Sequence, residues 1–546
     1  MADEGAGGQA GFDRELIGLL LRGEARDKGA IHRAKVRLAR KHMLDRIPSD
    51  AEVLAAAGPE ARERLLPLLR TKNVRELSGV VTVAAMTSPE SCPHGRCLYC
   101  PGGVERGSPQ SYTGKEPAAL RGSNYGFDSY REVAGRLEQL RACGHSTDKV
   151  DLIIMGGTFP ARPLDYQLHF IGGCYVALNG RQAPAQGGSS VTELEHEVAE
   201  AVDANERAPA RCIGLTIETR PDWCMEEQLD RMLSYGTTRV ELGVQSLSDD
   251  ALEKMQRGHG VKESARATQL ARDAGLKVGY HMMPGFPFVG REEEKGHYRR
   301  LFEDPDLRPD MLKLYPTLVM EGTGLHGLWK TGKYEPFSTG QAVEFLAEAK
   351  AHFPPWVRVQ RIQRDIPAQL IGDGVTKSNL RQLVRKRMEE RGLRCRCIRC
   401  REVGHLGLNV VGGEGLVLRR CGYDAAGGKE EFLSLEMEGE LGALAGYLRL
   451  RKPSPAAHRP ELRDGTSAMV RELRVLGELV PFEAKPGTRW QHRGLGAALL
   501  EEAERISKEE WRMKRLLVNS GAGARGYYRK TGYERVGPYM GKVLVS

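Results

Sequence analysis

Short apolar runs alternate with amphipathic segments over most of the chain from about residue 80 onward. The runs have the length of strands, and most are separated by segments with helical periodicity, such as residues 130–143 and 262–274. Strands and helices that alternate at this spacing form a parallel sheet. We therefore predict an α/β fold whose parallel sheet is open or closed into a partial barrel. The predicted strands are residues 80–83, 150–155, 213–217, 239–244 and 277–280.

The segment after the first predicted strand contains Cys92, Cys97 and Cys100 in a C-x4-C-x2-C spacing. Three thiolates on one loop can bind three irons of a 4Fe–4S cluster and leave the fourth iron open. A zinc site that lacks its fourth ligand is the alternative. Tyr99, directly before the last cysteine, favours the cluster, since an aromatic residue there is typical of radical S-adenosylmethionine (SAM) loops. The loop is one residue longer than the usual C-x3-C-x2-C of those enzymes.

Glycines and polar residues follow at the ends of later predicted strands. Glycine allows a ligand to approach the backbone closely. Their order and spacing resemble radical SAM enzymes of the coproporphyrinogen dehydrogenase branch, and this resemblance implies contacts with SAM. One departure is His281, where that branch has an aspartate near the ribose. The residues concerned are Gly156, Gly157 and Thr158 after the second predicted strand, Glu218, Gln245, and Arg257 on the helix that follows.

A second cysteine cluster, Cys395, Cys397 and Cys400, has the spacing C-x-C-x2-C. This spacing suits a structural zinc ion with a fourth ligand from elsewhere. His405 and Cys421 are the two candidates, and the sequence does not choose between them. A second iron–sulfur cluster is the alternative. We expect zinc, because the surrounding arginines indicate a small ordered linker and not a cofactor cavity.

The C-terminal region contains Q-x-x-G-x-G at residues 491–496, followed by a predicted helix over 497–507. Glycine amides at a helix N-terminus bind anions such as the pyrophosphate of coenzyme A. The motif follows a long predicted strand, residues 469–482, and precedes Tyr527 and Tyr528. This arrangement resembles GNAT acetyltransferases, in which a tyrosine beside the coenzyme A sulfur can hydrogen-bond to the leaving thiolate. We expect one of the two tyrosines to pack in the core.

Positive charge is concentrated in two blocks. Residues 22–46 contain nine Lys or Arg against three acidic residues, and residues 377–401 contain ten against two. Two separate basic blocks favour a polyanionic partner that spans domains, here RNA, over two solvated helix faces. The N-terminal residues have no signal-peptide pattern, and the apolar run 16–21 is too short to span a membrane. Eleven cysteines, mostly in the two clusters, predict metal sites in a reducing compartment, and therefore a cytoplasmic protein.

With both cofactor regions placed, the chain resembles the catalytic subunit of Elongator in its compact prokaryotic, archaeal-like form. The segments that carry the resemblance are residues 92–103, 148–160, 217–223, 471–477, 491–496 and 526–533. The resemblance implies that acetyl-CoA and SAM convert uridine 34 of tRNA to 5-carboxymethyluridine. It leaves open the electron donor, the need for partner subunits and a homodimer.

The resemblance also assigns the acetyl-CoA contacts. Lys149, on the radical SAM side, and Tyr527 are the expected catalytic residues, and both would contact acetyl-CoA. The two halves of the chain would then share one cleft. The remaining expected contacts are Arg471, Glu472, Leu473, Arg474, Gly494, Leu495 and Gly496.

The predicted organisation has four parts. Residues 1–78 form a basic helical tRNA-binding region, 79–390 a radical SAM domain, 391–410 a zinc linker and 411–546 the acetyltransferase domain. Two other functions remain open from the sequence. One is a protein lysine acetyltransferase with a structural iron–sulfur cluster, and the other is a tRNA-binding scaffold without catalysis.

Overall fold

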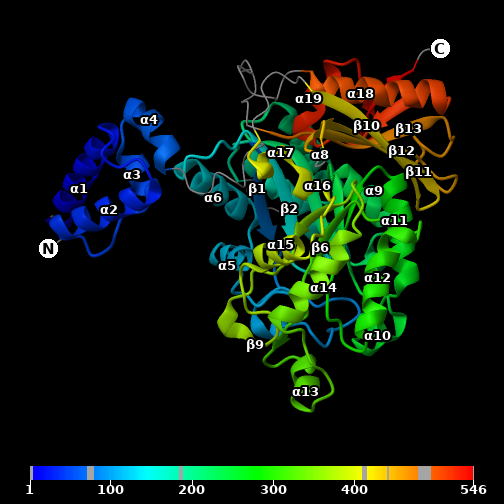
Figure 1. The fold of residues 1–546 in the computed structure, drawn as a ribbon. Coiled ribbons are helices and arrows are strands. Elements are labelled where there is room, and N and C mark those ends of the chain that lie inside the picture. Colours follow the sequence, from blue (N-terminus) through cyan, green and yellow to red (C-terminus); the bar gives the residue numbers. More distant parts are fainter. Residues whose placement is uncertain are drawn as a thin grey trace.

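The structure of the protein is a computed structural model, which describes residues 4–69, 79–183, 189–408, 415–439, 442–477 and 494–544. A group of helices, a curled parallel sheet and a second, mostly antiparallel sheet follow one another along the chain (Figure 1). None of the helices in these ranges is long and apolar enough to cross a bilayer.

The N-terminal helices form a small unit of their own around a core that includes Phe12, Leu16 and Leu54. This unit lies to one side of the rest and contacts it near α6 (Figure 1). Ser49 caps α3 with a hydrogen bond from the Glu52 amide, as expected for a helix start at this point. The helices are α1 (Glu4–Leu21), α2 (Lys28–Lys41), α3 (Asp50–Ala56) and α4 (Pro59–Leu69).

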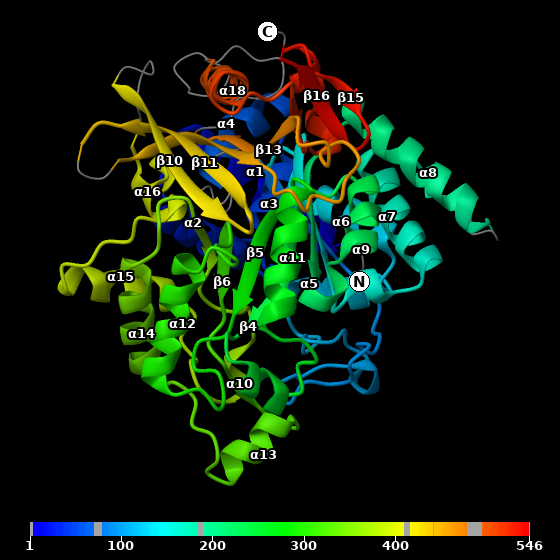
Figure 2. The ribbon, with the colours of Figure 1, turned by 90° about the vertical axis from the view of Figure 1, so that its right-hand side faces the viewer.

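Seven parallel strands form the central sheet in the order β1-β2-β3-β4-β5-β6-β8. The prediction of a partial α/β barrel is confirmed. Parallel neighbours in chain order require crossover helices, which cover the outer face (Figure 2). The strands are β1 (Val81–Met86), β2 (Lys149–Met155), β3 (Arg211–Thr219), β4 (Arg239–Gln245), β5 (Lys277–Met282), β6 (Met311–Leu314) and β8 (Arg358–Arg361).

The helices around this sheet differ from the sequence-based expectation at one place. Gly, Ala, Pro and Ser residues between positions 172 and 190 predict a surface loop, but residues 172–178 belong to α7. A Cβ atom on Gly173 would lie 2.4 Å from Ser129 Oγ of α6, so glycine here allows two helices to pack closely. The helices are α5 (Pro117–Asn124), α6 (Ser129–Ala142), α7 (Leu164–Leu178), α8 (Val191–Ala204), α9 (Glu226–Ser234), α10 (Asp249–Lys254), α11 (Val261–Asp273), α12 (Arg291–Glu303), α13 (Gly324–Lys330), α14 (Thr339–Ala351) and α15 (Leu380–Glu390); the short pair β7 (Val319–Met320) and β9 (Ile371–Asp373) lies beside α13.

The second sheet has the order β10-β11-β12-β13-β14-β16-β15. It is antiparallel except between β13 and β14. The short helices α16 (Ile398–Arg401) and α17 (Val403–Leu406) precede it. The apolar residues between 406 and 411 predict a strand, but residue 406 ends α17, and residues 409–411 lie outside the described ranges. Its elements are β10 (Leu416–Ala425), β11 (Gly428–Met437), β12 (Leu444–Lys452), β13 (Ser467–Val475), β14 (Arg515–Val518), β15 (Glu534–Val536), β16 (Tyr539–Val543), α18 (Leu495–Arg505) and α19 (Arg525–Arg529).

This second sheet packs across the amino-terminal edge of the half-barrel (Figure 2). A Cβ atom on Gly523 would lie 2.4 Å from Arg211 Cβ at the start of β3, so the two backbones approach as closely as glycine permits. Tyr539 Oη donates to the Ala274 carbonyl just before β5. The second sheet therefore does not cover the carboxyl edge of the barrel strands, which lies on the opposite side.

Candidate active site

A cavity of about 1090 Å³ lies inside the half-barrel. At the carboxyl edge of the strands its wall includes Cys92 and Tyr99 of the cysteine loop. At the other end the wall includes Arg474 of β13 and Gly477 just beyond it. The two regions that the sequence assigned to different cofactors therefore line one continuous space.

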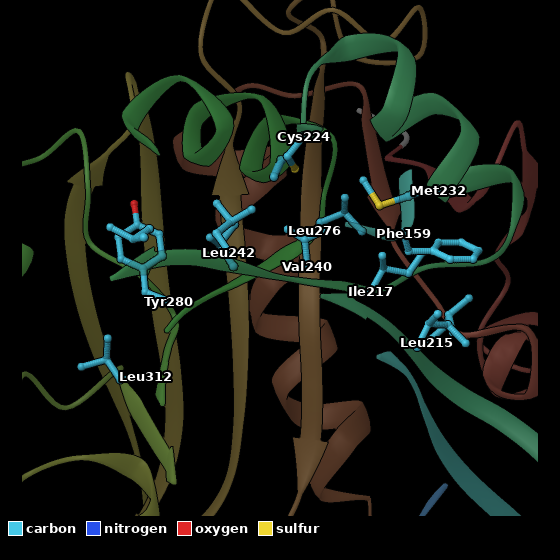
Figure 3. Close-up of a cluster of buried hydrophobic side chains, with 14 of the residues drawn as sticks. Phe159, Leu215, Ile217, Cys224, Met232, Val240, Leu242, Leu276, Tyr280 and Leu312 are labelled. Carbon is cyan, nitrogen blue, oxygen red and sulfur yellow. The ribbon is translucent and has the colours of Figure 1, made fainter. Parts of the chain in front are cut away.

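The cavity wall is polar because the barrel strands alternate in character. On β4, Arg239, Glu241 and Gln245 line the cavity. Their neighbours Val240 and Leu242 turn the other way and pack under the crossover helices (Figure 3). Since successive side chains of a strand point to opposite faces, charged residues inside apolar strands mark the inner face.

The sulfurs of the first cysteine cluster make hydrogen bonds to residues around the loop. Arg257 Nη1 donates to Cys97 Sγ at 3.6 Å, and the Ser111 amide donates to Cys100 Sγ at 3.2 Å. Donors of this kind suit thiolate ligands, although the Cys100 thiol itself donates to Gln110 Oε1 at 2.9 Å.

The residues predicted to contact SAM come together around this loop. Gly157, Thr158, Glu218, Gln245 and Arg257 all line the cavity at its carboxyl end. Gly156 lies directly behind them. It has a φ of 120°, and a Cβ atom there would lie 2.2 Å from Thr87 Oγ1. A residue with a side chain would be strained at this position.

Glu218 belongs to a charged cluster that was not predicted from the sequence. Its Oε1 accepts from Lys313 Nζ at 2.9 Å, and its Oε2 accepts from Tyr112 Oη at 2.8 Å. Lys313 also pairs with Glu241, which in turn contacts His281 at 3.0 Å. The cluster could have been predicted from charged residues within apolar strands. Residues 311–314 contain such a lysine, and residues 239–244 contain such a glutamate.

Lys149 lies at the amino end of β2, far along the strand from Gly156. Asp151, Ile153 and Met155 of the same strand line the cavity, and alternation places Lys149 on their face. Burial lowers the pKa of the Lys149 ammonium, an effect that Asp148 opposes. The residue thus lies on the side of the barrel that meets the second sheet.

The second sheet opens where coenzyme A is expected. Strands β13 and β14 pair only over Ser467–Val470, so the rest of β13 diverges from its neighbour. Gly494 caps α18 with a φ of 84°, and Leu495 begins the helix. Tyr527 lies over this turn, because a Cβ atom on Gly496 would be 2.8 Å from its Oη.

The second tyrosine behaves differently. Tyr528 is buried in the core of the sheet and packs edge-on against Tyr527, with ring centroids 5.2 Å apart. One of the two tyrosines therefore packs in the core, as expected. Residues 491–493 of the glycine motif lie outside the described ranges.

The four expected contacts on β13 divide between different environments. The side chains of Arg471 and Glu472 are not available to coenzyme A. Arg471 pairs with Asp310 and Glu430, and Glu472 pairs with Arg449, all in the buried interface between the two sheets. Any contact of these two residues with coenzyme A would therefore be made through their backbone groups, and it stays a prediction. Leu473 packs against the core of the second sheet, and Arg474 lines the cavity.

Comparison with known proteins agrees with this two-cofactor architecture. The radical SAM superfamily pattern matches residues 86–301, and the radical SAM C-terminal domain matches residues 309–390. The GNAT acetyltransferase domain matches residues 487–542, and the Elp3 N-terminal domain matches residues 12–77. The first two matches together fall on the half-barrel, the third on the second sheet and the fourth on the N-terminal helices.

Similar proteins extend over nearly the whole chain. The tRNA uridine(34) acetyltransferase of Methanocaldococcus jannaschii is 50% identical over 534 residues, which cover 96% of this chain and 95% of that protein. Elongator complex protein 3 of Schizosaccharomyces pombe is 44% identical over 542 residues, 97% of each chain. This chain belongs to the Elongator complex protein 3 (Elp3) family. The solved structure of Methanocaldococcus infernus Elp3 with an N-terminal deletion (1–46) has a TM-score of 0.73 at 46% identity, and covers 86% of this chain and 100% of that one.

The second cysteine cluster of this Elp3 chain forms a compact group. The sulfurs of Cys395, Cys397 and Cys400 lie within 4.8 Å of one another, which suits a single metal ion. Hydrogen bonds among the three cysteines lower the pKa of the Cys397 thiol and raise that of the Cys395 thiol. Within the described ranges neither expected fourth ligand joins the group. His405 Nε2 lies 3.5 Å from Glu402, and Cys421 is on β10.

The first basic block contains exposed arginines and a buried lysine that forms an ion pair. Arg33, Arg37 and Arg40 are exposed on α2 and make no hydrogen bond or ion pair within the described part of the chain. Lys35 is buried and pairs with Asp50 at 2.8 Å. Lys35 therefore belongs to the helical core and not to a surface that could bind RNA.

Proposed function

We propose that this protein modifies the wobble uridine of tRNA, forming 5-carboxymethyluridine at position 34 from acetyl-CoA in a SAM-dependent radical reaction. The names of its relatives support uridine 34 as the target. The observation that carries the proposal is the single cavity that joins the SAM end of the barrel to β13 of the acetyltransferase sheet. Two cofactor domains with separate sites would not need such a passage.

Cys92, Cys97 and Cys100 would hold the 4Fe–4S cluster, and the residues from Gly156 to Thr158 would hold SAM with Glu218, Gln245 and Arg257. When bound, the cluster and SAM supply a 5′-deoxyadenosyl radical, which can break an unreactive C–H bond. The protein's own part is to hold the acetyl methyl group and the uracil close together and away from water. The position of Arg257 near Cys97 supports a role in holding SAM next to the cluster.

Acetyl-CoA would lie along the diverging half of β13. The amides of Gly494, Leu495 and Gly496 would bind its pyrophosphate, because unpaired amides at a helix N-terminus attract anions. Tyr527, 40% exposed above Gly496, would hydrogen-bond to the sulfur of the bound donor. Lys149 would contact the donor from the barrel side, where its strand face leads into the cavity.

The other parts of the chain would serve RNA binding and the arrangement of domains. Residues 1–78 would bind tRNA through the exposed arginines of α2, and residues 391–410 would bind zinc through the three cysteines between residues 79–390 and 411–546. A uridine in a single-stranded anticodon loop can be turned outward at low cost. Thiols in both clusters would favour a reducing compartment such as the cytoplasm.

An anaerobic assay tests the proposal. Reconstituted protein is incubated with dithionite, SAM, acetyl-CoA and tRNA, and 5′-deoxyadenosine and the tRNA nucleosides are quantified by mass spectrometry. We expect 5′-deoxyadenosine and 5-carboxymethyluridine to form together, and both to be absent from Cys97→Ser. If 5′-deoxyadenosine does not exceed that control while protein lysines become acetylated, the protein is a lysine acetyltransferase instead.

A further inference from the structure

Four charged or ionisable side chains from four consecutive strands meet inside the barrel. They are Glu218 of β3, Glu241 of β4, His281 of β5 and Lys313 of β6, and all of them line the cavity. Glu241 is 1% exposed, so its charge must be balanced by its neighbours. Burial would raise the pKa of Glu241, but Lys313, His281 and Arg239 together hold it well below the ordinary value.

The geometry around His281 is that of a carboxylate–histidine dyad. Its Nε2 lies 3.0 Å from Glu241 Oε2, while Glu241 Oε1 lies 3.3 Å from Arg239 Nε. An ionised carboxylate accepts hydrogen bonds only, so Nε2 carries the proton and Nδ1 is the acceptor of the neutral ring. Nδ1 makes no hydrogen bond within the described residues, and the ring forms part of the cavity wall. The imidazole ring packs edge-on against the ring of Tyr315, with 5.5 Å between the ring centroids.

The same group could be read as a metal site, because ligand atoms of Glu218, Glu241 and His281 lie within 4.8 Å of one another. Lys313 argues against this. Its ammonium contacts both carboxylates and thus takes the place that a cation would need. Lys313 neutralises the charge of the two carboxylates in this way. The imidazole of His281 is then the group of the cluster that can accept a proton.

The proposed reaction leaves a task for such a group. Joining the acetyl methyl carbon to C5 of uracil yields a coenzyme A thioester, which water must cleave to give the carboxymethyl group. The thioester carbonyl is bonded directly to the carbon that reacts. The base that activates water must therefore lie inside the barrel, near the SAM contacts Glu218 and Gln245, and not in the acetyltransferase domain.

We propose that the Glu241–His281 dyad is the general base for this hydrolysis, an inference that rests on the proposed function. His281 Nδ1 takes a proton from water as the water oxygen bonds to the thioester carbonyl carbon. The C–S bond then breaks, and the protonated ring returns the proton to the coenzyme A thiolate. One water is consumed, and no oxidant or reductant is required. Glu241 orients the ring and stabilises its charged form, as in other carboxylate–histidine pairs.

Other candidate bases in the cavity wall are committed elsewhere. Asp151 pairs with Arg239 at 3.3 Å, and Glu402 pairs with Arg358 at 2.7 Å. His405 is the second histidine of the wall, but it lies beside Glu402, in the segment that precedes the second sheet. It therefore provides a matched comparison at the wrong end of the cavity.

The test uses the reconstituted holoenzyme with tRNA, SAM and acetyl-CoA, comparing wild type, His281→Gln and His405→Gln. Thioester on tRNA is trapped with hydroxylamine and measured by mass spectrometry, alongside 5′-deoxyadenosine and 5-carboxymethyluridine. In His281→Gln we expect 5-carboxymethyluridine formation to fall by about 100-fold or more, because a general base contributes at least that factor. Trapped thioester should accumulate while 5′-deoxyadenosine still forms.

Three outcomes would overturn the inference. In the first, 5′-deoxyadenosine falls in step with the product in His281→Gln, so that His281 serves SAM binding. In the second, His405→Gln accumulates the thioester and His281→Gln does not. In the third, free imidazole fails to restore hydrolysis in His281→Gly, a variant that keeps the inference testable if His281→Gln does not retain its iron. Wild-type protein that makes no 5′-deoxyadenosine would instead refute the proposed function.

Discussion

Arg471 of the acetyltransferase sheet and Asp310 of the radical SAM domain form an ion pair of 2.6 Å between Nη1 and Oδ2, and neither side chain is exposed to solvent. They belong to a buried network with equal numbers of positive and negative residues. The network crosses the boundary between the two domains and holds the second sheet against the amino edge of the half-barrel. It thereby fixes the relative position of the two domains that line the shared cavity. Its members are Arg272, Arg449, Arg451, Arg471, Asp273, Asp310, Glu430 and Glu472.

Removal of one member should destabilise the protein strongly. In Arg471→Met, Asp310 and Glu430 lose their closest cation, and an uncompensated buried charge costs about 3–5 kcal/mol. Thermal unfolding of the cluster-loaded protein should show a clear fall in midpoint. Arg505→Met, which removes surface pairs of Arg505 with Glu502, Glu509 and Glu510, is the control and should change the midpoint less. Equal effects of the two substitutions would contradict a special role for the buried network.

The exposed arginines of α2 should contribute to tRNA affinity by neutralising phosphates. Replacing Arg33, Arg37 and Arg40 by glutamine should weaken binding and reduce the slope of log affinity against log salt by about 0.7–0.9 for each phosphate that is no longer neutralised. Arg46→Gln is the control, because Arg46 already pairs with Glu52. Binding is measured by fluorescence anisotropy at several salt concentrations. An unchanged slope would mean that α2 is only a solvated surface.

The second cysteine cluster should bind zinc independently of iron. Cys397→Ser should lower the zinc content measured by elemental analysis and leave the iron content unchanged. Cys97→Ser should do the reverse, so each variant is the control for the other. Loss of both metals from both variants would show that the two clusters are not separate sites.

The sequence predicted features that depend on neighbouring residues, but it did not predict which residues far apart in the chain would pair. The short apolar run of residues 239–244 predicted strand β4, and the glycines at 156 and 157 predicted close approach of a ligand to the backbone, because both features are local in the sequence. The pairing of Lys313 with Glu241, or of Arg471 with Asp310, joins residues far apart in the chain, and nothing local specifies it. Gly172 and Gly173 led to the wrong prediction of a loop for a similar reason. Gly173 allows α7 to pack closely against α6, and this contact joins residues far apart in the chain.

Glu294 of α12 should make stability depend on pH. Its carboxyl accepts from the amides of Gly285 and Phe286, at 3.0 and 3.2 Å, and so holds the loop whose Phe286 ring packs against Tyr99 of the cysteine loop. Burial raises the pKa of Glu294 to about 7 from its ordinary 4.5, although the two amides oppose this. Between these values the folded protein keeps a proton that the unfolded chain has released.

The contribution of Glu294 to stability is therefore complete below pH 4.5 and is lost as the pH rises through about 7. The loss is at most about 1.4 kcal/mol per pH unit. Glu294→Gln should remove this dependence, so the difference in unfolding midpoint between wild type and variant should change from pH 5 to pH 7.5, to the disadvantage of the wild type. Glu292 is exposed on the same helix. The unfolding midpoint of Glu292→Gln should therefore change with pH in the same way as that of wild type. If Glu294→Gln also runs parallel, the carboxyl is ionised throughout this range and the loop is held by a charged acceptor.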